Sequence, residues 1–327
     1  MRRVITIGAS TVDCLMKSKA LKMLKSHEMP GGVAMCEVLG GKIEAEDGVL
    51  VTGGGATNVA VGLRRLGHSV KILSRVGDDL LSKMILDDLM KENINTELMQ
   101  QGKGRTGLSA VLVANNGARS IVTYRGESAE ITPLEINWNE MLKADWVQIS
   151  SLGGNVDLLE DVVSFLYSKK IKIGLNPGKG ELDHKDRLIR LLSKVDFVNT
   201  NKNEAAVLWG EDFENEKDMI LGFMKNGARL VAITNGKNGA SIATNGRWLQ
   251  VEAYPNKSID DTGAGDAFVS GAVSGILNDS DLETIIKSGL ANGGSVVTKL
   301  GAKAGLLYKN DMNKWLNKQL KIVEVNI

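Results

Sequence analysis

Residues 260–277 read DDTGAGDAFVSGAVSGIL, a loop of small residues that leads into a run typical of a buried helix. Gly263, Ala264 and Gly265 carry almost no side chain, so their N–H groups can face an anion directly at the helix N-terminus. Asp266 stands in the first turn, where the helix dipole favours a carboxylate and should lower its pKa. An anion site beside a carboxylate suits phosphoryl transfer, in which the amides hold the phosphate and the acid takes a proton from the nucleophile. The alternative is that Asp266 only stabilises the start of the helix.

A second glycine-rich loop lies in the N-terminal part, where residues 50–67 read LVTGGGATNVAVGLRRLG. A strand, glycines and a helix follow one another as in a dinucleotide-binding turn, but Asn58 stands where the third glycine of GxGxxG should pack. A Rossmann dehydrogenase is therefore disfavoured, and the chain contains no GxxxxGK[ST] sequence of the Walker A type. A plain structural turn would explain the glycines but not the polar Asn58.

Short β-branched runs alternate with amphipathic helical patterns along most of the chain. The runs lie at 4–8, 70–77, 146–150, 171–176, 197–201 and 230–236, and clear helical patterns lie at 80–93 and 158–170. This alternation predicts a mainly parallel sheet that is covered by helices on both faces. Because the chain has 327 residues and no linker or internal repeat, we expect one domain over residues 1–327.

Two regions break this alternation and predict a small β-rich lid, formed by about residues 13–50 and 96–125. The first is rich in Gly, Met and Lys and has little helical period. The second contains Asn115-Asn116-Gly117 between two β-rich runs, which is a strong hairpin signal. We therefore expect these two segments to pair with each other above the main sheet.

Composition excludes several other classes of protein. Lys and Arg number 40 against 39 Asp and Glu, and no long block of one sign occurs, so nucleic acid is not expected as a partner. Cys14 and Cys36 are too far apart for a CxxC pair, and His27, His68 and His184 are scattered, so no zinc site is indicated. Lone cysteines fit a reducing compartment, and no apolar run approaches the ~20 residues of a membrane span. We expect a cytoplasmic protein without a membrane partner.

Together the two glycine loops resemble the two signatures of the ribokinase-like (PfkB) carbohydrate kinase family. GGGATNVAVGLRRLG at 53–67 is similar to the N-terminal signature, and DDTGAGDAFVSGAV at 260–273 is similar to the C-terminal one. Shorter matches are VGDD at 76–79, NTNKNE at 199–204, TNGKNGA at 234–240 and VTKLGA at 297–302. The resemblance covers nearly the whole chain and implies a three-layer α/β sandwich with a mostly parallel central sheet and a small β-rich lid.

The resemblance also implies an ATP- and Mg²⁺-dependent kinase that phosphorylates a hydroxyl group. Asp266 matches the catalytic base of the family, and the loop Gly263–Gly265 matches its anion hole. The residues implied on the substrate side are Asp13, Gly54, Gly55 and Asn58. On the nucleotide side, Asn201 and Glu204 match the element that arranges Mg²⁺ and the phosphates, and Thr234, Gly236 and Gly239 match the stretch under the nucleotide. The main-chain groups of Asp260 and Thr262, with the loop near Gly301, match a monovalent-cation (K⁺) site.

The acceptor is less well defined, because the departures from the family pattern fall on the substrate side. Many sugar kinases of the family have Lys where this chain has Gly55, and segment 14–50 is longer than usual. No Phe, Trp or Tyr precedes Tyr124, whereas a nucleoside kinase is expected to stack its base on aromatic groups. We therefore expect a sugar or sugar derivative as acceptor.

Three further expectations complete the interpretation. A nucleoside kinase is the alternative, because methionines adapt to irregular apolar surfaces and could cover a base in place of aromatic rings. These methionines are Met16, Met23, Met29 and Met35. A non-enzymatic sensor built on an inactive kinase is disfavoured, because Asp266 and its glycine loop are both present. Two copies of the chain are expected to pair through the lid as a homodimer.

Overall fold

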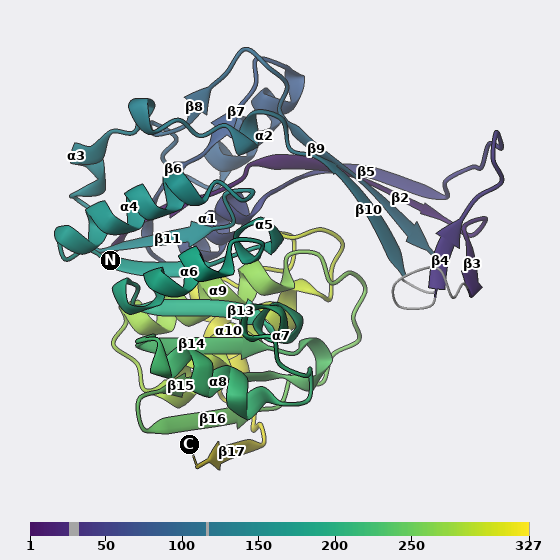
Figure 1. Ribbon diagram of the computed structural model, residues 1–327. Coiled ribbons are helices and arrows are strands. Elements are labelled where there is room, and N and C mark those ends of the chain that lie inside the picture. The colour runs from purple at the N-terminus through teal and green to yellow at the C-terminus, as the bar shows by residue number, and fades with distance from the viewer. Residues whose placement is uncertain (26–32, 116–117, 327) are drawn as a thin grey trace.

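The computed structural model describes residues 1–25, 33–115 and 118–326 (Figure 1). Within these residues a central sheet of nine strands forms the middle layer of the molecule. Its strands are β1 (Arg3–Ile7), β6 (Ser69–Leu73), β11 (Trp146–Ser150), β12 (Lys172–Asn176), β13 (Phe197–Asn201), β14 (Leu230–Thr234), β15 (Ala240–Thr244), β16 (Arg247–Val251) and β17 (Ile322–Val325). Their order across the sheet is β17-β16-β15-β14-β13-β12-β11-β1-β6.

The six strands from β6 to β14 run parallel, which confirms the predicted doubly covered parallel sheet. The sheet then continues through β15, β16 and β17, each antiparallel to its neighbour. Sequence analysis did not place these three strands. Gly239 lies in the turn from β14 to β15, and Gly246 lies in the turn from β15 to β16. Their φ angles are 96° and 99°. Only glycine adopts such angles without strain, so both residues permit the reversals of the chain.

Helices cover both faces of the sheet and enclose two separate hydrophobic cores. On one face lie α1 (Gly55–Arg65), α2 (Leu80–Lys91), α9 (Ala264–Leu277), α10 (Leu282–Val296) and α11 (Lys309–Leu316). On the other lie α3 (Trp138–Met141), α4 (Val156–Ser168), α5 (Lys179–Leu182), α6 (Lys185–Leu191), α7 (Lys202–Trp209) and α8 (Glu216–Lys225). Among the described residues, no helix combines the length and the apolar character needed to cross a membrane.

The small residues of α9 allow it to pack closely between α1 and α10. A Cβ atom on Gly62 of α1 would collide with the Ser270 hydroxyl of α9, and one on Gly271 of α9 would collide with the Ser288 carbonyl of α10. The Asn292 side chain of α10 donates to the Ser270 hydroxyl at 2.9 Å. Close packing of this kind leaves little freedom of position. It therefore fixes the N-terminus of α9, where the glycine loop begins.

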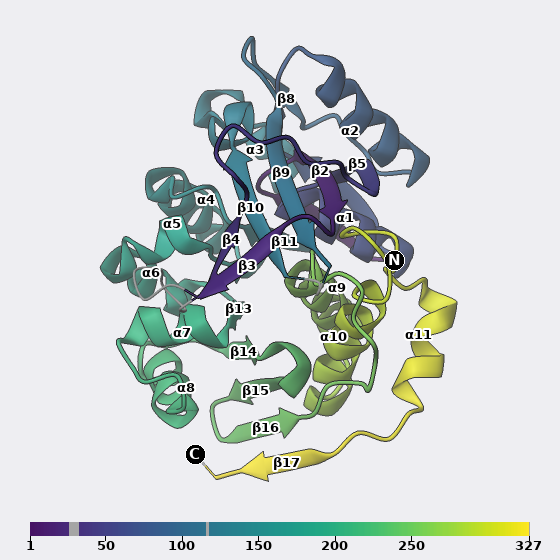
Figure 2. The ribbon, with the colours of Figure 1, turned by 90° about the vertical axis from the view of Figure 1, so that its right-hand side faces the viewer.

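A second, four-stranded sheet forms the lid, which extends away from the body in Figure 1 and points toward the viewer in Figure 2. It consists of β2 (Thr11–Ser18), β5 (Asp47–Gly53), β9 (Gly107–Ala114) and β10 (Arg119–Tyr124), in the order β10-β9-β2-β5. A hairpin of β3 (Lys22–Lys25) and β4 (Val33–Cys36) continues it. The predicted pairing of β9 with β10 is present, while Asn116 and Gly117 of the turn lie outside the described residues.

The second half of the lid sheet begins later in the chain than expected, at Gly107. Gln100 and Gln101 form β8, which pairs with β7 (Arg75–Val76) beside the central sheet and not with the lid. Residues 96–106 therefore lead from the body into the lid. Met29, one of the methionines considered for base contact, lies outside the described residues.

The two faces of the lid sheet carry different sets of side chains. Asp13 of β2 lies directly opposite Val51 of β5 and Ser109 of β9, and side chains that are directly opposite share a face of the sheet. The side chains at the positions between these residues along each strand point to the other face, which we call the outer face. That outer face carries large exposed apolar side chains, namely Met16, Leu50, Leu112, Val122 and Tyr124.

Candidate active site

The predicted site residues gather where the parallel strands end. Ile7 of β1 is the register partner of Ile149 of β11, so both strands end at the same edge of the sheet. Asn201 of β13 and Thr234 of β14 are likewise register partners at that edge. Ligands of open α/β sheets bind in the crevice outside the carboxyl ends of such strands. The fold therefore provides one edge at which the substrate and nucleotide elements can meet.

The two glycine loops are joined by a hydrogen bond between side chains that are 208 residues apart in sequence. Asn58 Nδ2 in the first turn of α1 donates to Asp266 Oδ2 in the first turn of α9 at 2.8 Å. Asn58 is buried, and its Oδ1 atom has no partner among the described residues. Predicted as a substrate contact, Asn58 also holds the predicted base. This accounts for a polar residue where a nucleotide-binding turn would have glycine.

The glycines of the first loop are required by close contacts with other parts of the site. A Cβ atom on Gly53 would collide with the Asp13 carboxylate. Gly54 has a φ angle of 97°, and a side chain there would collide with the carbonyl of Ala9. At Gly55 a Cβ atom would lie 2.7 Å from Ser150 Cβ and 3.6 Å from Asp266 Oδ1. A lysine at position 55, as in many sugar kinases of the family, would therefore have to displace Ser150.

These contacts bring two residues predicted for the substrate side, Asp13 and Asn58, and the predicted base Asp266 around a single loop. Ser150, at the end of β11, lies beside them and was not predicted. Its hydroxyl is buried and has no partner among the described residues. A buried hydroxyl without a partner costs free energy, so a ligand or water hydroxyl is favoured at this point. A sequence signal could have been its position at the end of a buried strand.

Burial raises the pKa of the Asp266 carboxyl, and the nearby Asp13 adds to this effect, while the hydrogen bond from Asn58 and the charge of Lys303 oppose it. The expectation that the helix dipole would lower this pKa is therefore wrong, because loss of hydration is the larger effect at this position. Burial also raises the pKa of the Asp13 carboxyl, opposed by a hydrogen bond with Ser109 and by Lys303. A carboxylate with a raised pKa is a stronger base when ionised.

The loop before α9 has the shape expected of an anion hole. Gly263 caps the helix with a φ angle of 76°, and a side chain on it would collide with Ala302. A Cβ atom on Gly265 would meet no atom within 4 Å, so the loop is open beside the first turn. Ala264 donates its N–H to the carbonyl of Asp261 at 3.3 Å, which closes the turn. The residues present thus fit a phosphate at the positive end of the α9 dipole.

The side chain of Asp260 joins Thr262 and Gly301, the two positions implied with it in a monovalent-cation site. Asp260 Oδ1 accepts hydrogen bonds from Thr262 N at 2.9 Å and Thr262 Oγ1 at 2.6 Å, and Oδ2 accepts one from Gly301 N at 2.8 Å. Arg119 of lid strand β10 also donates to this carboxylate. Sequence analysis did not identify Arg119, because no spacing in the sequence connects the lid hairpin to the loop at 260–262.

On the nucleotide side, Asn201 and Glu204 form a reciprocal cap at the start of α7. Asn201 Oδ1 accepts from Glu204 N, and Glu204 Oε2 accepts from Asn201 N, both at 2.9 Å. Burial raises the pKa of Glu204, and the charges of Asp266 and Glu181 raise it further. Such mutual repulsion favours a cation nearby, so these residues fit Mg²⁺. In residues 1–25, 33–115 and 118–326, no group of three or more His, Cys, Asp or Glu side chains is placed to hold a metal ion.

The stretch predicted to lie under the nucleotide follows β14. Thr234 ends this strand, and its hydroxyl donates to the carbonyl of Thr200 in β13 at 3.4 Å. Gly236 and Gly239, with φ angles of 51° and 96°, form the turn that leads into β15. A side chain on Gly236 would meet no atom within 4 Å. The turn is therefore open beside Asn201, the register partner of Thr234.

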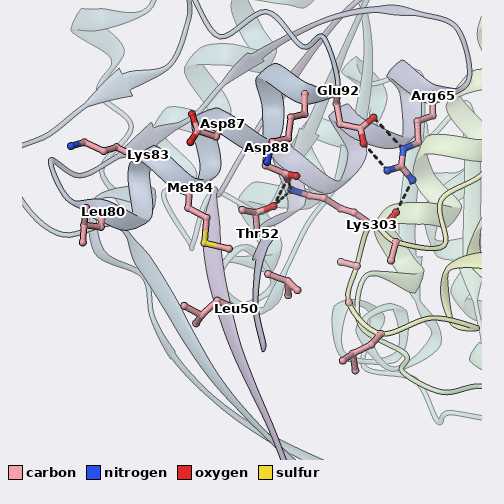
Figure 3. A pocket seen from close by; sticks show the side chains of 16 residues that line it. Leu50, Thr52, Arg65, Leu80, Lys83, Met84, Asp87, Asp88, Glu92 and Lys303 are labelled. Atoms are coloured by element: carbon pink, nitrogen blue, oxygen red, sulfur yellow. Dashed lines mark hydrogen bonds and ion pairs between the residues drawn. The ribbon is translucent and has the colours of Figure 1, made fainter. Parts of the chain in front are cut away.

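Lys303 is a third residue that sequence analysis missed, and it lines a cavity of about 570 Å³ (Figure 3). The cavity lies between β5, α2 and the loop at 300–304. Lys303 Nζ donates to Thr52 Oγ1 at 2.7 Å and to Asp88 Oδ2 at 2.9 Å. Burial lowers the pKa of Lys303, and Asp88 and Asp13 oppose this. The sequence signal for this residue was a lysine among the small residues of GAKAG at 301–305. Small neighbours indicate close packing, and a buried lysine needs a partner.

Comparison with known proteins agrees with this geometry. The model of the pfkB family carbohydrate kinases matches residues 4–308. The ribokinase of Staphylococcus aureus is 28% identical over 320 residues, which are 95% of this chain and 99% of that protein. Fructokinase-2 of Oryza sativa is 27% identical over 282 residues, 79% of this chain and 83% of that protein.

Solved structures share the fold. A ribokinase from Thermotoga maritima has a TM-score of 0.80 at 18% identity and covers 97% of this chain and 100% of its own. A nucleoside kinase from Methanocaldococcus jannaschii has a TM-score of 0.77 at 20% identity and covers 98% of this chain and 99% of its own. The predicted three-layer fold with its lid is thereby confirmed. Because the family match includes both loops that meet at Asp266, this chain belongs to the pfkB family of carbohydrate kinases, phosphotransferases that act on an alcohol group.

Proposed function

We propose that the protein transfers the terminal phosphoryl group of ATP to a hydroxyl of a sugar or sugar derivative, with Asp266 as the catalytic base. The observation that supports this best is the hydrogen bond from Asn58 to Asp266. It holds a carboxylate with a raised pKa beside the open start of α9. Base, anion site and the predicted substrate residues then lie within one small region.

Bound Mg²⁺–ATP supplies the phosphoryl group and part of the charge that stabilises the transition state. The chain's own groups position the acceptor and move its proton. Asn58 binds Asp266 through Oδ2, which leaves Oδ1 to accept the proton of the attacking hydroxyl. The backbone N–H groups of Gly263 and Gly265 hold the oxygens of the moving phosphate, and Asn201 and Glu204 orient the metal–phosphate end. Asp13 accepts a hydrogen bond from another hydroxyl of the acceptor.

The lid favours a sugar over a nucleoside as acceptor. Its inner face carries polar groups beside Asp13, among them Ser109 and Thr11. The aromatic residue of the four lid strands, Tyr124, lies directly opposite Leu108 and therefore on the outer face. An inner lid face of this kind offers hydrogen bonds to hydroxyls but no ring on which a base could stack. The relatives named ribokinase and fructokinase support the same acceptor class.

A substrate panel tests this proposal. Release of ADP from Mg²⁺–ATP is measured with pentoses, hexoses, sugar phosphates and nucleosides at equal concentrations. We expect at least one sugar or sugar derivative to give the highest kcat/KM. Faster turnover of adenosine, inosine or cytidine than of every sugar would replace the proposal with a nucleoside kinase. Absence of turnover with every acceptor, although ATP binds, would favour a sensor.

Substitution of Asp13 by Asn is expected to raise the acceptor KM and to change kcat little. The exchange keeps the shape of the side chain but removes a charge-assisted hydrogen bond, worth about 1.5–3 kcal/mol. The KM should therefore rise about 10- to 150-fold. Steady-state kinetics with the acceptor identified by the panel provide the measurement. An unchanged KM would remove Asp13 from the acceptor site.

We also propose that two copies of the chain pair through the outer face of the lid. Its exposed apolar side chains, Met16, Leu50, Leu112, Val122 and Tyr124, share one side of a sheet and carry no charge. A large exposed apolar patch on a protruding sheet is typical of an interaction surface. Val122 is 72% exposed, so we expect Val122→Asp to shift the protein from dimer to monomer in sedimentation velocity. A monomeric parent protein would contradict the proposal.

A further inference from the structure

We propose that Arg119 of the lid, and not a bound monovalent cation, supplies the positive charge that holds the loop leading into the anion hole. The inference rests on the proposed function only in calling that loop an anion hole. It revises the K⁺ site implied at Asp260, Thr262 and Gly301. The lid of the protein would then hold in place the loop that forms its own anion hole.

Arg119 binds two of the three residues that precede the glycines of this loop, Asp260 and Thr262. Its Nη1 atom donates to Asp260 Oδ1 at 3.1 Å and to Thr262 Oγ1 at 2.9 Å. Asp260 Oδ1 also accepts the Thr262 N–H and hydroxyl, and Oδ2 accepts the Gly301 N–H. The carboxylate thus has neutral donors at both oxygens and one cationic partner among the described residues.

Burial makes this cationic partner important. The Asp260 side chain is only 8% exposed, and an ionised carboxylate at such a position is costly unless an opposite charge compensates it. Arg119 provides that charge at the side chains of Asp260 and Thr262, two of the residues at which a monovalent cation was expected. A single amino group of the guanidinium, Nη1, donates to a carboxylate oxygen and to a hydroxyl oxygen at once, and thereby links Asp260 to Thr262.

The contact fixes a segment that has little rigidity of its own. Thr262 is followed by Gly263, with its φ angle of 76°, and then by two more small residues. Glycine loses more conformational entropy than other residues on ordering, so an anchor immediately before it limits the movement of the loop. Arg119 therefore acts as a positioning residue for the backbone N–H groups that face the phosphate.

The same face of the lid carries Asp13 and Arg119. Asp13 lies opposite Ser109, and Arg119 lies opposite Val113, four residues further along β9 and therefore on the same side of the sheet. Movement of the lid toward or away from the body would move both residues together. Binding of the acceptor by Asp13 and support of the phosphate loop by Arg119 are thereby coupled through one rigid sheet.

Exchange of the monovalent cation in the parent protein and in Arg119→Ala tests the proposal. Activity is measured in K⁺ and in tetramethylammonium at constant ionic strength. The parent protein should have equal rates in both. In tetramethylammonium, Arg119→Ala should lose at least about tenfold in kcat, the loss of one charge-assisted hydrogen bond, and K⁺ should restore part of it. Arg119→Lys should retain more activity than Arg119→Ala, because it keeps the charge.

Lys19→Ala is the matched control, because it removes a cation from the lid without touching the loop. Lys19 is exposed and pairs with Glu46 of the lid itself at 3.7 Å. This variant should have the kcat and the cation response of the parent. Three results would overturn the proposal: a parent protein that needs K⁺ as much as Arg119→Ala does, a normal kcat in Arg119→Ala, or a loss that neither K⁺ nor Arg119→Lys restores.

Thermal unfolding gives a readout that does not depend on activity. A ligand that binds only the folded state raises Tm, so K⁺ should raise the Tm of Arg119→Ala and leave that of the parent unchanged. Equal increases in both proteins would place the cation in a site that Arg119 does not occupy, and would overturn the inference. If no acceptor is phosphorylated, the proposed function fails, whereas the Tm comparison still decides the role of Arg119.

Discussion

Asp266→Asn is expected to lower kcat about 10²–10⁴-fold, the usual range for loss of a general base. The amide keeps the size of the side chain but cannot accept the proton of the attacking hydroxyl. ATP affinity should change little, because the phosphate is held by backbone N–H groups and not by this carboxylate. Single-turnover kinetics with the acceptor found by the panel separate the chemical step from binding. A near-normal kcat would leave Asp266 as a helix-stabilising group only.

The stability of the same variant checks that the loss is not caused by unfolding. The pKa of Asp266 is raised in the folded protein above its ordinary value of 3.8, mainly by burial. Protonation therefore favours the folded state, and the parent loses this stabilisation as pH rises from the ordinary value through the raised one. Asn cannot ionise, so Asp266→Asn should have an equal or higher Tm at neutral pH. A marked fall in Tm would mean that the carboxylate mainly stabilises the fold.

Asn58→Asp is expected to move the acid limb of the kcat–pH profile to higher pH by more than about one unit. The exchange is isosteric, but it removes the donor that lies 2.8 Å from Asp266 and replaces it with a second carboxyl group. Two carboxyl groups at this distance cannot both ionise easily, so the pKa of the pair rises. Because the base must be ionised to act, activity at neutral pH falls and part of it should return at alkaline pH.

Asn58→Ala separates this effect from substrate binding. It removes the hydrogen bond to Asp266 without adding a charge, so kcat should fall while the acid limb shifts much less than in Asn58→Asp. A rise in acceptor KM alone in both variants, with unchanged pH profiles, would assign Asn58 to the acceptor and not to Asp266. Thermal unfolding of both variants controls for the burial of this side chain.

Much of the main sheet could be predicted because its signals are local. The buried strand at 146–150 has the predicted bounds, and the run at 197–201 does as well. Continuous β-branched runs between amphipathic helices specify parallel strands by composition alone. The strands β15 to β17 were missed. The last of them, Ile322–Val325, lies at the edge of the sheet and pairs with Arg247–Val251. A short edge strand has no strong pattern of its own, and its place depends on a distant partner.

The sequence by itself determined the fold class, the two glycine loops and the carboxylates that flank them, because each of these depends on residue types at short spacing. Only the tertiary structure decided which groups meet. Asn58 reaches Asp266 across 208 residues, Lys303 lies behind Asp13 next to Asp88, and Arg119 binds Asp260 and Thr262. It also reversed the expected pKa shift of Asp266, since burial is a property of the packed chain and outweighs the local effect of a helix N-terminus.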